Sequence, residues 1–150
     1  NGDRSDRSDR NVGLYIAESQ IGELVKAGVK KETIIDVYKT IVLSADFIQD
    51  AEAADGRARS AYDALVRKQS DCDAAAHTDS AFLDARGYNT MLLGFPNHAE
   101  AIVQIEGNWY SFVSGYFHNL GNTKELEQFL KSRPDVYVFT QPTYGDLIND

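Results

Sequence analysis

The sequence predicts an α+β fold, in which helices come first and then pack on a mostly antiparallel sheet. Three observations predict it. Apolar residues recur at helical spacing in the first half, β-branched and aromatic residues replace Ala, Glu and Lys after Gly87, and turn signals divide that second half into strands. Helices followed by such strands give the α+β arrangement. At 150 residues and 43% hydrophobic composition, the chain suits a single domain over residues 11–150.

The first half of the chain is predicted to be helical after a polar start. Residues 1–10 contain a repeat of Asp, Arg and Ser that cannot bury apolar surface, so we expect a flexible tail or linker there. A first amphipathic helix precedes Gly28, and a second runs from about residue 31 to residue 55. A third helix is expected over roughly residues 57–68.

Strands and one further helix are expected after Gly87. The predicted strands cover residues 91–93, 98–105, 109–113 and 136–139. We expect a loop over residues 115–121. Asn122 and Glu125 then have the spacing of a capping box, which predicts a short helix that ends before Pro134.

Charge and composition narrow the classes of partner. The formal net charge is -8, and Lys and Arg do not cluster outside the N-terminal repeat, so we expect no nucleic-acid partner. No apolar run is long enough to span a bilayer, and no signal-peptide pattern precedes Asn11. One cysteine permits no internal disulfide, which leaves the compartment open, cytoplasmic or secreted.

Cys72 occupies the position at which a side chain is most expected to be reactive. It follows Ser70 and Asp71, two good helix N-caps, and precedes an Ala-rich segment that ends at Gly87. We therefore expect Cys72 in the first turn of a helix. There the unpaired backbone N–H groups and the positive end of the helix dipole favour an anion and lower the pKa of a thiol.

His98 opens a segment that alternates as a half-buried strand does, with Ala99 on the apolar face and His98 and Glu100 on the other. A cysteine at a helix start followed by a histidine at a strand start is the order of a Cys-His pair, in which the imidazole takes the thiol proton. His77 lies five residues after Cys72, about 140° around the helix, and is expected to face solvent.

These segments resemble the transglutaminase-like cysteine enzyme superfamily. In that family a Gly-Asp-Cys-Glu-like helix entry precedes a Gly-bounded helix end, a short strand and a His-Ala-Trp-Val-like strand. The matching segments here are Ser70-Asp71-Cys72-Asp73, Ala85-Arg86-Gly87-Tyr88, Thr90-Met91-Leu92-Leu93-Gly94, His98-Ala99-Glu100-Ala101-Ile102-Val103 and Gly107-Asn108-Trp109-Tyr110. The resemblance covers roughly residues 61–115 and implies a papain-like Cys-His fold, with Cys72 as nucleophile and His98 as base.

The family's third catalytic residue, usually an Asp that orients the imidazole, has no acidic counterpart here. Counted from Trp109, its place falls on Val113, which can neither accept the ring N–H nor stabilise an imidazolium. Three residues could substitute: Ser114 through a bulge, Asn119 from the following loop, or Glu100 on the strand of His98. Asn119 and Ser114 rank ahead of Glu100 in this prediction.

The resemblance implies acyl transfer or hydrolysis at an amide of a protein or peptide: glutamine deamidation, transamidation or peptide cleavage. Cys72 would form a thioester and its backbone N–H would bind the oxyanion, with Gln69 as a candidate second donor. No cofactor is expected. Cys72, Asp73 and His77 lack the paired spacing of a zinc motif, so no metal is expected either.

The sequence is also compatible with other functions. A module that keeps the fold, has lost the triad and binds a protein partner is the main alternative, with Val113 as its sign. A papain-like or NlpC-like cell-wall peptidase shares the Cys-then-His order, but its nucleophile and base are usually separated by more residues. A bacterial effector that deamidates a host protein would suit the size of the chain.

Overall fold

The computed structural model describes residues 17–54 and 72–139 of the chain. Three sequence predictions lie outside the described residues: the tail over residues 1–10, the third helix over residues 57–68 and the donor role of Gln69. The helix-capping positions Ser70 and Asp71 lie outside them as well.

The described strands form one five-stranded sheet, in which every pairing is antiparallel and the strand order is β4-β3-β2-β1-β5. The strands are β1 (Thr90–Phe95), β2 (His98–Ile105), β3 (Asn108–Ser111), β4 (His118–Gly121) and β5 (Tyr137–Phe139). The predicted α+β class with a mostly antiparallel sheet is confirmed.

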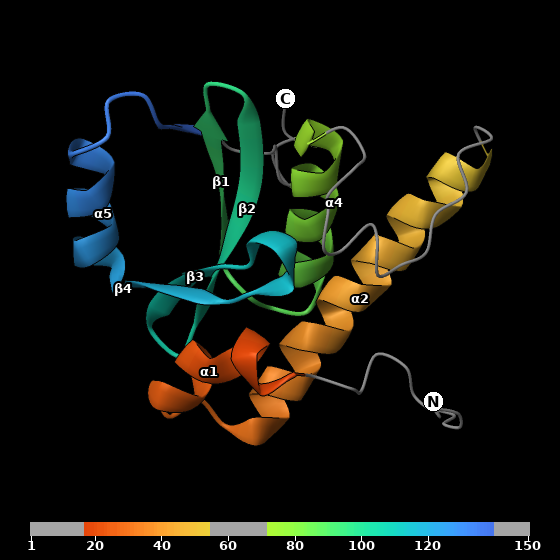
Figure 1. Ribbon diagram of the computed structural model, residues 1–150, viewed down its shortest axis with the longest axis horizontal. Helices are drawn as coiled ribbons and strands as arrows, with labels where there is room; N and C mark the ends of the chain where they lie inside the picture. The colour runs from red at the N-terminus through yellow and green to blue at the C-terminus, as the bar shows by residue number, and fades with distance from the viewer. Residues whose placement is uncertain (1–16, 55–71, 140–150) are drawn as a thin grey trace.

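Helices cover both faces of this sheet (Figure 1). On one face α4 (Cys72–Ala85) packs against β2 and β1, and the long α2 (Lys31–Ala54) packs on the outside of α4. The short α1 (Glu18–Lys26) lies at the end of this layer and contacts β4, while α5 (Thr123–Lys131) covers the opposite face. On its face, α4 therefore lies between α2 and the sheet.

Two apolar clusters, one on each face of the sheet, hold these layers together. The cluster on the α4 side includes Leu24, Val37, Ala76, Leu83, Ala99, Ala101 and Val103. The cluster on the α5 side includes Leu93, Ile102, Trp109 and Leu126. Successive residues of a strand point to opposite faces, so β2 contributes Val103 to one cluster and Ile102 to the other. The β2 side chains on the same side of the sheet as Val103 therefore point toward α4.

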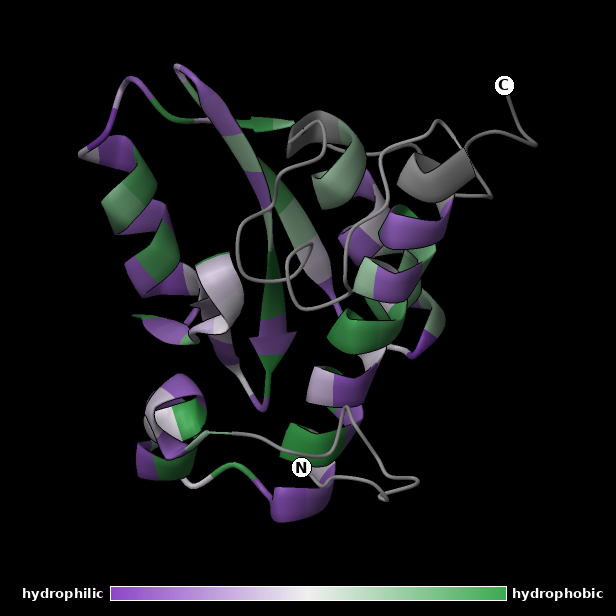
Figure 2. Ribbon diagram, turned by 45° about the vertical axis from the view of Figure 1, so that its right-hand side comes forward, coloured by the Kyte–Doolittle hydropathy of each residue, from purple (hydrophilic) through white to green (hydrophobic). Residues whose placement is uncertain are grey.

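The helix ends follow from local chemistry. α4 ends at Ala85 because Gly87 adopts a φ of 96°, a left-handed conformation that glycine adopts at little cost. α5 begins after Asn122, whose side chain accepts a hydrogen bond from the Glu125 N–H while Glu125 accepts from the Asn122 N–H, as the sequence predicted. Hydrophobic and hydrophilic segments alternate along α5 (Figure 2). The buried Leu126 of this helix belongs to the cluster on the α5 side of the sheet.

Two predictions for the second half were wrong in detail. The third strand ends at Ser111, two residues earlier than expected, because the chain turns into a short 3-10 helix over Val113–Gly115 with Ser114 at a φ of 55°. The expected loop over residues 115–121 contains β4, which pairs with β3. Its residues are too polar to reveal a strand by alternation, and the pairing with β3 decides its conformation.

Gly94 on β1 lies beneath the ring of Tyr137 on β5, and a methyl group at position 94 would overlap that ring. Because Tyr137 is 60% exposed, the ring can swing away into solvent and lose its packing on β1. We expect Gly94→Ala to lower the free energy of unfolding by about 1 kcal/mol, the usual size of a cross-strand pair. Gly22→Ala in α1 is the control: nothing surrounds that position, and alanine favours a helix. If Gly94→Ala and Gly22→Ala both raise the melting temperature, the contact with Tyr137 does not limit which residue fits at position 94.

Candidate functional site

Position 72 shares a stripe of α4 with residues that face β2. Ala75, Ala76 and Asp79 follow it by three, four and seven residues, which places all four positions on one side of a helix. Ala75 and Ala76 are buried, and Ala76 belongs to the apolar cluster on the α4 side of the sheet. Cys72 lies in α4, in agreement with the predicted helix; its side chain and the residues just before it are outside what the structure describes.

A depression lies where the first turns of α4 meet the start of β2. Its lining residues are Ala75, Ala76 and Asp79 from α4, His98, Ala99, Glu100 and Ala101 from β2, and Phe112 and Val113 after β3. The depression has a volume of about 310 Å³, part of it open to solvent. Small side chains on both α4 and β2 leave this space, because alanine fills little of the gap between a helix and a sheet.

The depression lies at an edge of β2. β3 pairs with β2 only as far as Ser111 opposite Ile102, so among the described residues no strand pairs with residues 98–101 on that side. Four consecutive residues of β2 line the depression although their side chains alternate between the two faces of the sheet. The site therefore borders both faces of β2.

His98 begins β2, as predicted, and its side chain is about one-third exposed. It lies directly opposite Phe95 in the β1–β2 hairpin, and the two rings are 5.6 Å apart. Phe95 packs on the α5-side cluster, whereas Ala99 belongs to the α4-side cluster. The imidazole thus starts from the face of β2 turned away from α4, and its route to position 72 runs around the edge of the strand.

Glu100 is the candidate third residue closest to the imidazole. Its Oε1 lies 3.8 Å from Nε2 of His98, and its side chain is 15% exposed. Both residues line the depression and lie on the same face of β2. The structure therefore brings together His98 and Glu100.

Asn119 is on β4, opposite Tyr110, which in turn lies opposite Val103. Val103 is five residues along β2 from His98, so Asn119 lies roughly 17 Å along the strands and about 10 Å across them from the imidazole. Its Oδ1 accepts a hydrogen bond from the Gly121 N–H, and its own N–H donates to Glu23. Asn119 therefore has a local structural role in β4.

Val113 is 36% exposed and lines the depression with His98. The position at which the family resemblance expects an acidic residue thus lines the same depression as the histidine, although the residue there is apolar. Ser114 is the next residue, in the 3-10 turn, and is not among the lining residues. The turn brings position 113 to the site.

Asp79 is a lining residue that the sequence analysis missed. Its side chain is 2% exposed, and its Oδ1 accepts a hydrogen bond of 2.6 Å from Ser44 on α2, which is itself fully buried. The spacing of positions 72, 75, 76 and 79 is the signal that could have identified it. Asp79 and Glu100 give the lining two acidic side chains, and no lysine or arginine is among the lining residues that the structure describes.

The expectation for His77 was wrong. Its side chain is partly buried, and its ring lies 5.7 Å from that of Phe139 on β5, in an edge-on arrangement. Residue 77 is on the side of α4 that approaches β5, a packing that only the strand order reveals. Within residues 17–54 and 72–139, no group of three or more His, Cys, Asp or Glu side chains is placed to bind a metal ion. Over the same residues, no helix has both the length and the apolar character of a membrane span.

The chain was compared with models of protein families, with curated proteins and with solved structures, and none of the three comparisons finds a match.

Proposed function

We propose that this chain is a thiol-dependent enzyme of the transglutaminase-like type, which transfers or hydrolyses the acyl group of an amide in a protein or peptide. The observation that carries the proposal is that the helix beginning at Cys72 and the strand beginning at His98 border one depression. A nucleophile at a helix start next to a histidine is the arrangement that lowers a thiol pKa and provides a base.

The proposed reaction uses the thioester route. His98 takes the thiol proton, the sulfur attacks the amide carbon, and the backbone N–H at the start of α4 donates to the oxyanion. The C–N bond then breaks as the imidazolium returns the proton to the leaving nitrogen, which departs as ammonia or an amine. Water or a second amine attacks the thioester, and the thiol re-forms.

Two features support a polypeptide amide as the substrate. The depression lies at the edge of a strand and opens to solvent, so a side chain or loop of a folded protein can reach it. The described part of its lining has two acidic side chains and no lysine or arginine, which disfavours anionic substrates such as phosphates or nucleotides. Neutral amides, including the side chain of glutamine, fit this chemistry.

A binding module with a degenerate site is the second candidate. It is favoured by Val113 at the place where the family has an acidic residue and by the imidazole on the face of β2 turned away from α4. In such a module the depression would bind a partner side chain without chemistry. Both candidates use the same surface, and the reactivity of the thiol separates them.

Alkylation by iodoacetamide tests the proposal site-specifically, because Cys72 is the one cysteine of the chain. We expect the rate to rise with pH around a midpoint between about 4 and 7, against about 8.5 for an ordinary thiol. His98→Ala should move the midpoint to about 8.5 and slow alkylation at pH 6 roughly tenfold, since a higher thiol nucleophilicity offsets part of the lost thiolate.

His118→Ala is the matched control, because His118 is exposed on β4 and outside the depression. It should leave the midpoint unchanged. A wild-type midpoint near 8.5 that His98→Ala does not move would reject the enzyme and favour the binding module. If the wild-type midpoint is low as expected, ammonia release from a glutaminyl peptide that is absent in Cys72→Ala would identify deamidation as the reaction.

A further inference from the structure

We propose that Glu100 is the positioning residue for His98, in the role that the family resemblance gives to position 113. This inference rests on the proposed function. Glu100 was the lowest ranked of the three candidates from the sequence. It is on β2, the strand that carries His98, whereas position 113 follows β3.

The geometry fits an orienting carboxylate. Glu100 is two residues after His98, so both side chains leave β2 on the same face, and Oε1 lies 3.8 Å from Nε2. That distance is an electrostatic contact longer than an N–H···O hydrogen bond, and catalytic contacts of this kind commonly shorten when substrate binds. The contact is on Nε2, which leaves Nδ1 to take the thiol proton.

Phe95, opposite His98 in the β1–β2 hairpin, also contacts the imidazole. Its ring lies 5.6 Å from that of His98 at an interplanar angle of 35°. The ring of Phe95 restricts rotation of the imidazole, and the carboxylate selects which nitrogen carries the outward proton. Together the two contacts hold His98 in one orientation at the edge of the depression.

The charged groups around His98 limit the alternatives. Of the lining residues that the structure describes, Glu100 on β2 and Asp79 on α4 are the acidic ones; Phe112 and Val113 after β3 contribute no charge. Asp79 is buried on the α4 side and already accepts from Ser44, whereas Glu100 shares the face of His98. Glu100 is therefore the carboxylate placed to stabilise the imidazolium that forms when His98 takes the thiol proton.

The test is the pH midpoint of Cys72 alkylation in paired variants. Glu100→Gln keeps the shape and removes the charge, and it should raise the midpoint by about one pH unit, the low end of the effect of a neighbouring opposite charge. Adding Val113→Asp to Glu100→Gln should bring the midpoint back, because position 113 lines the same depression as His98 and a carboxylate there restores the negative charge. Adding Val113→Asn in its place should not, since asparagine carries no charge.

Glu127→Gln on the exposed face of α5 is the matched control and should match the wild type. An unchanged midpoint in Glu100→Gln, together with the full effect of His98→Ala, would overturn the role of Glu100 and leave the proposed function intact. Equal rescue by Val113→Asn and Val113→Asp would also overturn it, because charge would then not be the cause. A wild-type midpoint near that of an ordinary thiol would reject the proposed function itself.

Discussion

Asp79→Ala is expected to lower the free energy of unfolding by about 3 kcal/mol. Asp79 is 2% exposed and accepts the hydroxyl of Ser44, which no solvent reaches. The substitution leaves that hydroxyl without its acceptor, at about 1–3 kcal/mol, and opens a small cavity between α2 and α4. Urea unfolding followed by circular dichroism measures the loss.

A double-mutant cycle separates the hydrogen bond from the cavity. Ser44→Ala removes the donor, so Ser44→Ala/Asp79→Ala should cost less than the sum of the two single variants. Asp50→Ala, at an exposed position of α2, should change stability by less than about 0.5 kcal/mol. If Asp79→Ala behaves like Asp50→Ala, the Ser44–Asp79 bond does not anchor α4 to α2.

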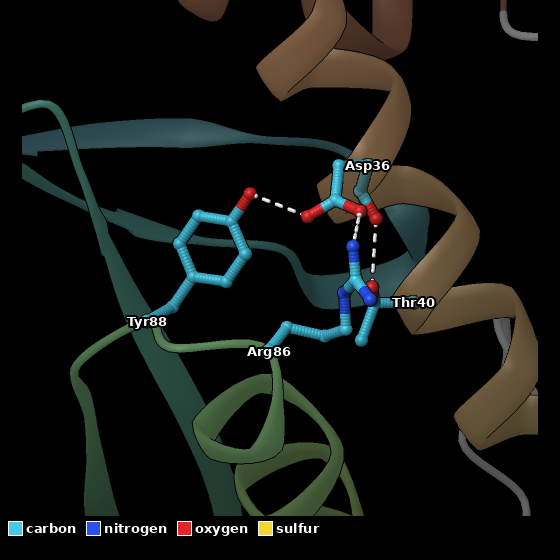
Figure 3. A network of polar contacts seen from close by, with 4 residues as sticks. All are labelled: Asp36, Thr40, Arg86 and Tyr88. Carbon is cyan, nitrogen blue, oxygen red and sulfur yellow. Dashed lines mark hydrogen bonds and ion pairs between the residues drawn. The ribbon is translucent and has the colours of Figure 1, made fainter.

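Asp36→Ala is expected to cost about 2 kcal/mol, because Asp36 joins α2 to the turn after α4 (Figure 3). One carboxylate oxygen accepts from the hydroxyl of Tyr88 at 2.7 Å, and the other accepts from Arg86. The Arg86 side chain is 57% exposed, and an ion pair so exposed contributes little. Most of the effect should come from Tyr88, so Tyr88→Phe should lose more than Arg86→Gln.

The same contacts predict how stability depends on pH. Burial alone would raise the pKa of Asp36, but the hydrogen bonds from Tyr88 and Arg86 and the Arg86 charge outweigh it and lower the pKa below the usual 3.8. A lowered carboxyl pKa stabilises the fold above pH 3.8, and this contribution is lost as the pH falls through the folded-state value. Burial, and then the hydrogen bond to Asp36, raises the pKa of Tyr88 to about 12.

A raised tyrosine pKa has the opposite sign. The neutral hydroxyl of Tyr88 contributes fully below pH 10, and its contribution is lost as the pH rises from 10 to about 12. The stability difference between the wild type and Tyr88→Phe should therefore be constant from about pH 5 to 9 and shrink at both extremes. A difference that persists unchanged at pH 12 would contradict the Asp36–Tyr88 bond. Urea unfolding at each pH gives the comparison.

The local elements of the fold were predictable because their causes are local. Gly87 ends α4 through its own backbone conformation, and Asn122 with Glu125 starts α5 through bonds within four residues. The second helix and the strand that begins at His98 were predicted from periodicity, which reports one buried face. β4 was missed because its four residues are held by pairing with β3 and not by a pattern of their own.

The site was predictable in part. The helix at Cys72 and the strand start at His98 were predicted, and position 113, counted from Trp109, lines the same depression as His98. The ranking of Asn119, Ser114 and Glu100 could not be settled in this way, since it depends on where β3 ends and on which strand β4 pairs with.

The sequence by itself determined the described α-helices, the described strands other than β4, and which side chains have the chemistry, because helix caps, glycine turns and alternating apolar residues act within a few residues of each other. The tertiary structure decided which of those side chains meet. Helix packing and strand order place Asp79 under α2 and Asn119 on a distant strand. These are long-range contacts, and their distances depend on packing between segments that no local pattern specifies.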